Sequence, residues 1–199
     1  MKIATIPIVS KSDQYVLENY VERGIEIQNL EPLLFRKLYS TLVLSHSSKT
    51  ISLWGFSAGE RSRDANLWNT LNTTDLIIFL DDEKLLQFGI LVSKLLSESV
   101  ALALWGDFEE KPRQYLITFE KLETPNPQLI EVVSRFISKL NISRELFQVT
   151  ELSQISHIFS ERDSKLFQDF ISSSLSIVEN PHANHGDTNT EIFELLQSQ

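Results

Sequence analysis

The sequence predicts an α+β domain in which a small, mostly antiparallel β-sheet or barrel is flanked by helices at both ends. Short apolar runs of strand length gather in the middle of the chain, roughly between residues 49 and 119. Amphipathic segments with helical spacing lie on either side of them. The regular alternation of strands and helices that builds a doubly wound parallel sheet is missing.

The N-terminal segment predicts one strand and two helices. Residues 3–9 alternate well enough for a strand, and Pro7 indicates an edge position because proline cannot donate to a ladder hydrogen bond. Residues 12–23 form a predicted helix, with a cap at its first two residues and a stop at Gly24. A second helix is expected over residues 32–44, opened by a proline.

The middle of the chain predicts most of the sheet. A short helix is expected around residues 65–71, and the acidic turn 81–84 joins two strands in a hairpin. The predicted strands are 49–56, 76–80, 86–92, 100–105, 114–119 and 146–150.

The C-terminal part predicts helices followed by a polar tail. Apolar residues recur at helical spacing from Pro127 to Leu140 and again over 153–175. From about Glu179 the chain is polar and without periodicity, which is typical of a linker or disordered tail. The predicted division is an N-terminal strand and helices packed on the core (1–47), the core (48–155), a C-terminal helix (156–178) and the tail (179–199).

Composition narrows the classes of function. The 199 residues contain no cysteine, which excludes disulfides, thiolate zinc sites and a cysteine nucleophile, and favours a reducing cytoplasm. No apolar run approaches the roughly 20 residues of a membrane span. The net charge of −9 argues against tight, salt-driven binding to nucleic acid, yet allows weak binding that reads one base in a pocket. No glycine-rich phosphate loop is present, and no cofactor is predicted.

One set of polar residues suggests a metal-dependent nuclease. Asp81 and Asp82 follow a predicted strand, and Glu109 with Lys111 lies about thirty residues later. Such carboxylates can hold Mg²⁺ while the lysine stabilises charge on a phosphate. Both pairs fall in predicted turns, where acidic residues ordinarily face water. The nuclease therefore stays an alternative.

Two tryptophans suggest an aromatic slot. Trp54 and Trp105 each end an apolar run and precede a glycine. Two rings at strand ends could face each other and sandwich a flat base by stacking, or enclose a methylated group. Equally, both rings could close the ends of the core, as most tryptophans do. The residues by themselves leave these interpretations open.

The order of several motifs resembles a known superfamily. The motifs are Ile51-Ser-Leu-Trp54-Gly55, Asp64-Ala-Asn66-Leu67, Asp75-Leu-Ile-Ile-Phe-Leu80, Leu86-Gln-Phe-Gly-Ile-Leu-Val92 and Leu104-Trp105. Together they resemble the PUA-like superfamily, in its EVE and YTH branches. Leu146-Phe-Gln-Val149 extends the likeness to the EVE-like domains at the N-terminus of McrB-type modification-dependent restriction proteins. The resemblance covers about residues 48–155.

This resemblance implies a non-catalytic domain that flips a modified base, in DNA more than in RNA, into an aromatic pocket. Trp54 and Trp105 match the two cage tryptophans, and Asn66 matches the asparagine that bonds the base edge. Gly55 belongs to the same site, and Trp68 has no secure counterpart. Candidates for a third wall are Phe56, Phe108 and Leu86.

The resemblance also implies partners beyond the base. Basic side chains expected to border the pocket and to contact phosphates are Arg61, Arg63, Lys94, Lys111 and Arg113. An effector such as a nucleotide-driven motor or a nuclease domain would supply the chemistry of a restriction or phage-defence system. A protein-interaction module without any nucleic-acid role is the remaining alternative.

Overall fold

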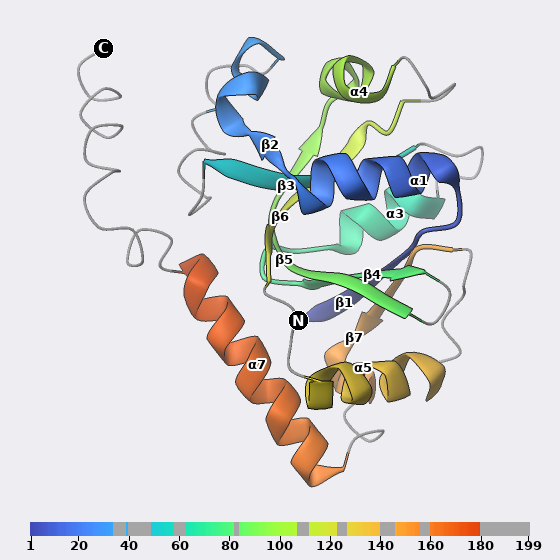
Figure 1. The fold of residues 1–199 in the computed structure, drawn as a ribbon, viewed down its shortest axis with the longest axis vertical. Coiled ribbons are helices and arrows are strands. Elements are labelled where there is room, and N and C mark those ends of the chain that lie inside the picture. The colour runs from blue at the N-terminus through green and yellow to red at the C-terminus, as the bar shows by residue number, and fades with distance from the viewer. Residues whose placement is uncertain are drawn as a thin grey trace.

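A computed structural model gives the fold (Figure 1). It describes residues 1–33, 39, 49–57, 63–81, 84–106, 112–122, 127–139, 146–155 and 160–179. The strands are β1 (Lys2–Pro7), β2 (Ile25–Glu26), β3 (Thr50–Phe56), β4 (Leu76–Asp81), β5 (Lys84–Leu96), β6 (Tyr115–Lys121) and β7 (Gln148–Glu151). The helices are α1 (Lys11–Val16), α3 (Arg63–Thr70), α4 (Glu98–Trp105), α5 (Pro127–Lys139), α6 (Leu152–Ile155) and α7 (Glu161–Glu179), with a π-helical η1 (Leu17–Glu22) and a 3₁₀ η2 (Ile27–Leu33).

The sheet confirms the predicted α+β class. Its strand order is β2-β3-β6-β5-β4-β1-β7, and β4 and β5 form the expected hairpin. Among the described strands, β1 and β4 form the one parallel pair, and the other pairs are antiparallel. The sheet stays open, because the described edge strands β2 and β7 do not pair with each other. The open sheet is therefore correct and the closed barrel is not.

The position predicted for the first strand is wrong. β1 lies inside the sheet, between β4 and β7, and not at an edge. Its pairing with β7 covers only Lys2 to Thr5, so Pro7 lies beyond the end of that partner. Proline therefore costs no hydrogen bond here, and the argument from its missing N–H does not apply.

The strand predicted at 100–105 is a helix instead. Ser97 caps α4 by accepting a hydrogen bond from the amide of Val100 at 3.3 Å. Helix-favouring alanine and leucine residues follow the cap. The strand prediction is therefore wrong for this run, which has helical spacing, with Val100, Ala101 and Trp105 buried and Leu102 exposed. Trp105 consequently ends a helix rather than a strand.

The first helix begins two residues earlier than predicted. Ser10, not Ser12, is the N-cap of α1, and its hydroxyl and the carboxylate of Asp13 form a reciprocal capping box. The stop is as predicted: Gly24 has a φ of +74°, a left-handed conformation that glycine adopts without strain. Of the helix expected over 32–44, the first two residues end η2 and residue 39 is described, while the rest of it and the tail from 180 lie outside the described residues.

The sheet is strongly curled. Phe56 on β3 and Phe147 just before β7 stack with ring centroids 4.3 Å apart. Five strand steps separate β3 from β7 in the order of the sheet, which would be about 24 Å in a flat sheet. The two ends of the sheet therefore approach each other without pairing.

The curl divides the core into two clusters. Ile77 and Phe79 on β4 face the inner cluster, together with Trp54, Trp105 and Phe119. Alternate residues of the same strand face an outer cluster, which α5 and α7 cover from the other side (Figure 1). Within the described residues, no helix is long and apolar enough to cross a membrane.

Candidate functional site

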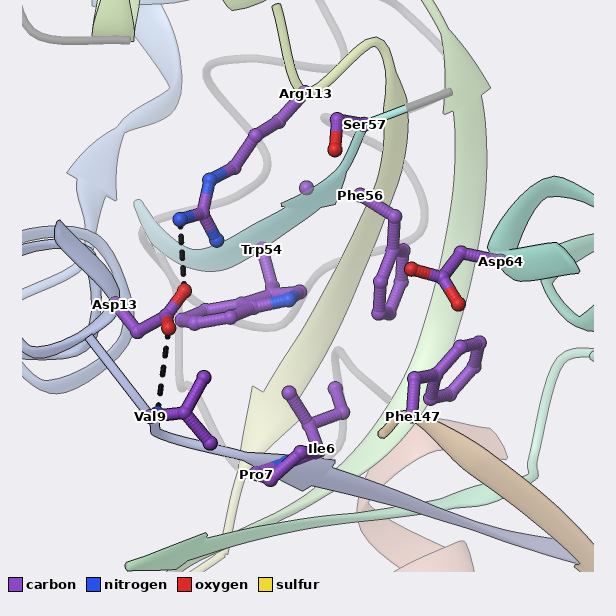
Figure 2. Close-up of a pocket in the computed structure, with 11 residues that line it drawn as sticks. Ile6, Pro7, Val9, Asp13, Trp54, Phe56, Ser57, Asp64, Arg113 and Phe147 are labelled. Atoms are coloured by element: carbon purple, nitrogen blue, oxygen red, sulfur yellow. Dashed lines mark hydrogen bonds and ion pairs between the residues drawn. The ribbon is translucent and has the colours of Figure 1, made fainter. Parts of the chain in front are cut away.

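A pocket of about 190 Å³ opens where the two ends of the curled sheet come together (Figure 2). It lies at the ends of β1 and β3, beside the first turn of α3 and the chain leading into β6 and β7. Its apolar wall consists of Ile6, Pro7, Val9, Trp54, Phe56 and Phe147. Its other lining residues are Asp13, Gly55, Ser57, Asp64 and Arg113. We call this the Trp54 pocket.

Glycine at position 55 allows the close approach that shapes this pocket. A Cβ atom there would lie 2.5 Å from the carbonyl oxygen of Arg113 and 2.6 Å from a ring carbon of Trp105. Both separations are far below ordinary contact distances. Gly55 therefore lets the chain before β6 pass directly over β3, which places the Arg113 side chain above Trp54.

Arg113 and Asp13 form a shielded ion pair at the pocket wall. Arg113 Nη2 donates to Asp13 Oδ1 at 2.7 Å, and each side chain is 12% exposed. The guanidinium carbon lies 5.1 Å from the centroid of the Trp54 ring, within the range of a cation–π contact. Figure 2 shows the guanidinium over the indole, with Asp13 beside it. The ion pair thus covers one face of the tryptophan.

The second carboxylate oxygen of Asp13 accepts hydrogen bonds at the start of α1. It accepts hydrogen bonds from the backbone amides of Val9 and Ser10, at 3.3 Å and 3.0 Å, and from the Ser10 hydroxyl at 2.7 Å. One carboxylate therefore joins the start of α1 to Arg113, a hundred residues away in the chain. The position of Arg113 relative to the start of α1 therefore depends on the Asp13 side chain.

Asp64 is the acidic group at the opposite wall. Figure 2 shows its carboxylate directed towards the rings of Phe56 and Phe147. Burial raises the pKa of Asp64 above its usual range, and the neighbouring charge of Arg63 partly offsets that effect. Within the described part of the chain, its carboxylate has neither a hydrogen bond nor an ion pair. Asp64 is therefore an acceptor available to a ligand.

The predicted slot between two exposed tryptophans is absent. Trp54 is 2% exposed and Trp105 is 1% exposed, so both rings belong to the core. Trp54 borders the pocket, whereas Trp105 packs edge-on against Tyr20 behind Gly55. The expectation of facing, accessible rings failed because Trp105 ends a helix. Its indole N–H is buried without a hydrogen-bond partner among the described residues.

The other predicted aromatic and amide residues are dispersed. Asn66 is exposed on α3 and is not part of the pocket wall, although Asp64 two residues earlier is. Trp68 is a core residue whose indole N–H donates to the Leu116 carbonyl at 2.9 Å. Among the candidates for a third wall, Phe56 lines the pocket and Leu86 packs against the inner cluster. Phe108 lies outside the described residues.

The predicted basic rim is brought together only in part. Arg113 is engaged with Asp13, and the Lys94 ammonium donates to the carbonyl oxygens of Trp68 and Asn69 at 3.1 Å and 3.2 Å. Arg63 is exposed in the first turn of α3, beside Asp64. Two further predicted cations, Arg61 and Lys111, lie outside the described residues.

The nuclease alternative gains no support from the geometry. Asp81 is exposed at the end of β4, and Asp82, Glu109 and Lys111 lie outside the described residues. In the part of the chain that the structure describes, no three histidine or acidic side chains gather where they could hold a metal.

Several lining residues are not among the predicted site residues, and three of them matter most to the pocket. The sequence gives Asp13 only the role of a helix cap, because its partner Arg113 lies a hundred residues away. Phe147 was read as part of a strand, although its ring closes the pocket against Phe56. Asp64 is the first residue of the Asp64-Ala-Asn66-Leu67 motif, and it is this carboxylate, not the Asn66 amide, that lines the pocket.

Comparison with known proteins adds a likeness of fold. No family model matches the sequence, and no curated protein matches it closely enough to be reported. A solved structure, the N-terminal domain of Thermococcus gammatolerans McrB bound to m5C DNA, is similar with a TM-score of 0.53 and 14% sequence identity. The match covers 85% of this chain and 99% of that one. The protein described here therefore has the fold of a McrB N-terminal domain, as the order of its motifs had suggested.

Proposed function

We propose that this chain is a non-catalytic DNA-binding module that takes a modified base into the Trp54 pocket. The observation that carries the proposal is the likeness of fold to a McrB N-terminal domain that was solved on m5C DNA. It extends over nearly the whole of that domain and is not confined to a common substructure. The pocket of this chain lies at the rim of the shared sheet, where loops and strand ends converge.

The lining of the pocket suits one flat ring. Its volume of about 190 Å³ is below the roughly 300–1,000 Å³ of a site for a drug-sized ligand. Aromatic side chains on two walls offer stacking worth about 1–3 kcal/mol for a base. This gain offsets the few kcal/mol that extrusion from the duplex costs. Because Trp54 is buried and covered by Arg113, entry of a base requires the guanidinium to move aside.

Contacts to the phosphate backbone are few in this proposal. Arg63 is exposed next to the pocket and is our first candidate for such a contact. Phosphate contacts by Arg113 or Lys94 would require each to leave its present partners. With a net charge of −9, the chain should show a shallow dependence of affinity on salt. Selectivity for the modified base would then exceed general affinity for DNA.

The wider role follows from this binding activity. We infer that the chain is the specificity module of a restriction or defence system in the cytoplasm, and that an effector motor or nuclease provides the chemistry. Residues 179–199, polar and acidic in sequence, would serve as the connection to that effector. RNA remains a weaker candidate target than DNA.

The test is a binding titration with a variant that fills the pocket. Ser57 lines the pocket at the end of β3, outside the buried core, so Ser57→Leu should block entry without emptying a cavity. We expect the parent to prefer duplex DNA with one 5-methylcytosine over the unmodified duplex, and Ser57→Leu to remove the preference. Ser172→Leu, the same substitution at an exposed site on α7, is the matched control and should bind as the parent does.

Two outcomes would contradict the proposal. If the parent binds duplexes with 5-methylcytosine, 5-hydroxymethylcytosine, 6-methyladenine and no modification equally well, the chain does not read modified bases. If Ser57→Leu keeps the full preference, the base does not enter the Trp54 pocket. Mg²⁺-dependent cleavage of DNA by the purified chain would overturn the non-catalytic part of the proposal.

A further inference from the structure

We propose that Asp64 selects the base by accepting a hydrogen bond from its exocyclic amino group. This inference rests on the proposed function, because it assigns a role within the same pocket. It replaces Asn66, the residue that the sequence indicated for reading the base edge, because Asn66 is exposed and lies off the pocket wall.

The carboxylates of the pocket differ in whether their oxygens already have hydrogen-bond partners. They are those of Asp13 and Asp64. Both oxygens of Asp13 are occupied, one by Arg113 and the other by backbone amides and the Ser10 hydroxyl. The Asp64 carboxylate has no such partner among the described residues and points into the pocket (Figure 2). Asp64 is therefore the acidic side chain that a ligand can use.

The partial burial of the Asp64 carboxylate has a cost in free energy. Burying a charged oxygen with no hydrogen bond is unfavourable, and burial is the main cause that raises the pKa of Asp64. An incoming N–H donor would relieve this cost. An incoming carbonyl oxygen would add repulsion between two acceptors. The carboxylate thus favours a donor at the position where the base edge arrives.

Only some bases carry an exocyclic amino group that could donate to this carboxylate. Carboxylates accept from the N4 amino group of cytosine, whereas thymine presents an O4 carbonyl at the same position. Since 5-methylcytosine and thymine share the 5-methyl group, a pocket that senses only shape and apolar contact would confuse them. A carboxylate at the edge distinguishes them. Adenine carries an amino group as well, and hypoxanthine carries a carbonyl in its place.

The experiment compares bases that differ in this one group. The full chain is titrated with duplexes that hold 5-methylcytosine or thymine opposite an abasic site, so that neither base must give up a pairing partner. A second pair of duplexes holds adenine or hypoxanthine. In at least one of the two pairs, we expect the parent to prefer the base with the amino group, 5-methylcytosine or adenine. Asp64→Asn should reduce that preference by roughly fivefold to a hundredfold. The amide of Asn can turn its NH₂ towards a carbonyl, so the affinity of Asp64→Asn for the carbonyl-bearing member, thymine or hypoxanthine, should rise.

The control is Asp169→Asn, an equal change of charge at an exposed position on α7, which should leave every ratio unchanged. Asp64→Glu, which keeps the carboxylate, should retain the sign of the preference and shows that the fold tolerates change here. If the parent discriminates modified from unmodified DNA but Asp64→Asn keeps the same ratio within both pairs, the role of Asp64 is refuted and the proposed function stands. If the parent shows no preference for modified DNA at all, the proposed function fails first.

Discussion

Trp54 and Trp68 each lie beneath a cation, and the two contacts have different surroundings. The guanidinium of Arg113 lies 5.1 Å from the Trp54 ring, and the ammonium of Lys94 lies 4.7 Å from the Trp68 ring. Lys94 is bonded to backbone carbonyls at the C-terminal end of α3, which its charge stabilises. Arg113 is bonded to the side chain of Asp13 at the wall of a pocket.

This comparison separates a structural contact from one that a ligand can exchange. Carbonyls at the end of a helix are held in place by the helix, so Lys94 contacts a fixed part of the fold. A carboxylate–guanidinium pair is neutral as a whole, and a phosphate oxygen or an acceptor on a base edge can take the place of the carboxylate beside the guanidinium. The proposed function therefore uses the aromatic–cation contact at Trp54, where the second partner of the cation is a side chain at the wall of a pocket.

The largest expected effect comes from breaking the pair at Trp54. Asp13→Ala breaks the ion pair with the shielded guanidinium and also removes the carboxylate half of the capping box of α1, while Ser10 stays as the N-cap. We expect the free energy of unfolding to fall by about 3–5 kcal/mol for the broken ion pair, and by up to about 1 kcal/mol more for the lost hydrogen bonds of the capping box. Urea denaturation followed by circular dichroism measures this loss.

An exposed ion pair supplies the control for this change. Glu131 and Arg135 lie 4.0 Å apart on α5, with the glutamate side chain 73% exposed, so Glu131→Ala should cost well under 1 kcal/mol. If Asp13→Ala lowers the free energy of unfolding no more than Glu131→Ala does, the structure around the Trp54 pocket does not depend on the Asp13–Arg113 ion pair.

A smaller effect is expected at the other tryptophan. Lys94→Met keeps the length and apolar stem of the side chain but removes its charge from the α3 carbonyls and from Trp68. The two contributions together amount to about 1–2 kcal/mol of the free energy of unfolding. Lys165→Met, at an exposed position on α7, is the matched control and should be neutral. A marked loss of DNA affinity in Lys94→Met, with stability unchanged, would instead assign Lys94 the phosphate contact that the sequence suggested.

The smallest expected effect is the pH dependence contributed by Asp64. Because burial raises its pKa in the folded state above the ordinary 3.8, its contribution to stability is complete below 3.8 and is lost as the pH rises through the folded-state value. The difference in unfolding free energy between the parent and Asp64→Asn should therefore shift against the parent as the pH rises from acid to neutral. Denaturation curves at a series of pH values test this sign, and a shift in favour of the parent would contradict it.

The sequence by itself determined the local elements and the family of folds. The hairpin of β4 and β5, strand β3, the stop at Gly24 and the apolar face of α5 all follow from periodicity and turn chemistry within short windows. The order of motifs predicts the fold of a McrB N-terminal domain, and the structural likeness confirms that fold. The sequence predicts these features because the residues that cause each of them lie close together in the chain.

Only the tertiary structure decided the pocket. The internal position of β1 and the curl that brings Phe147 onto Phe56 depend on partners far along the chain. Asp13 and Arg113 stand a hundred residues apart, and no local pattern relates them. Pairing between distant segments depends on the packing of the whole core. Many residues contribute to that packing together, so no short stretch of sequence predicts it.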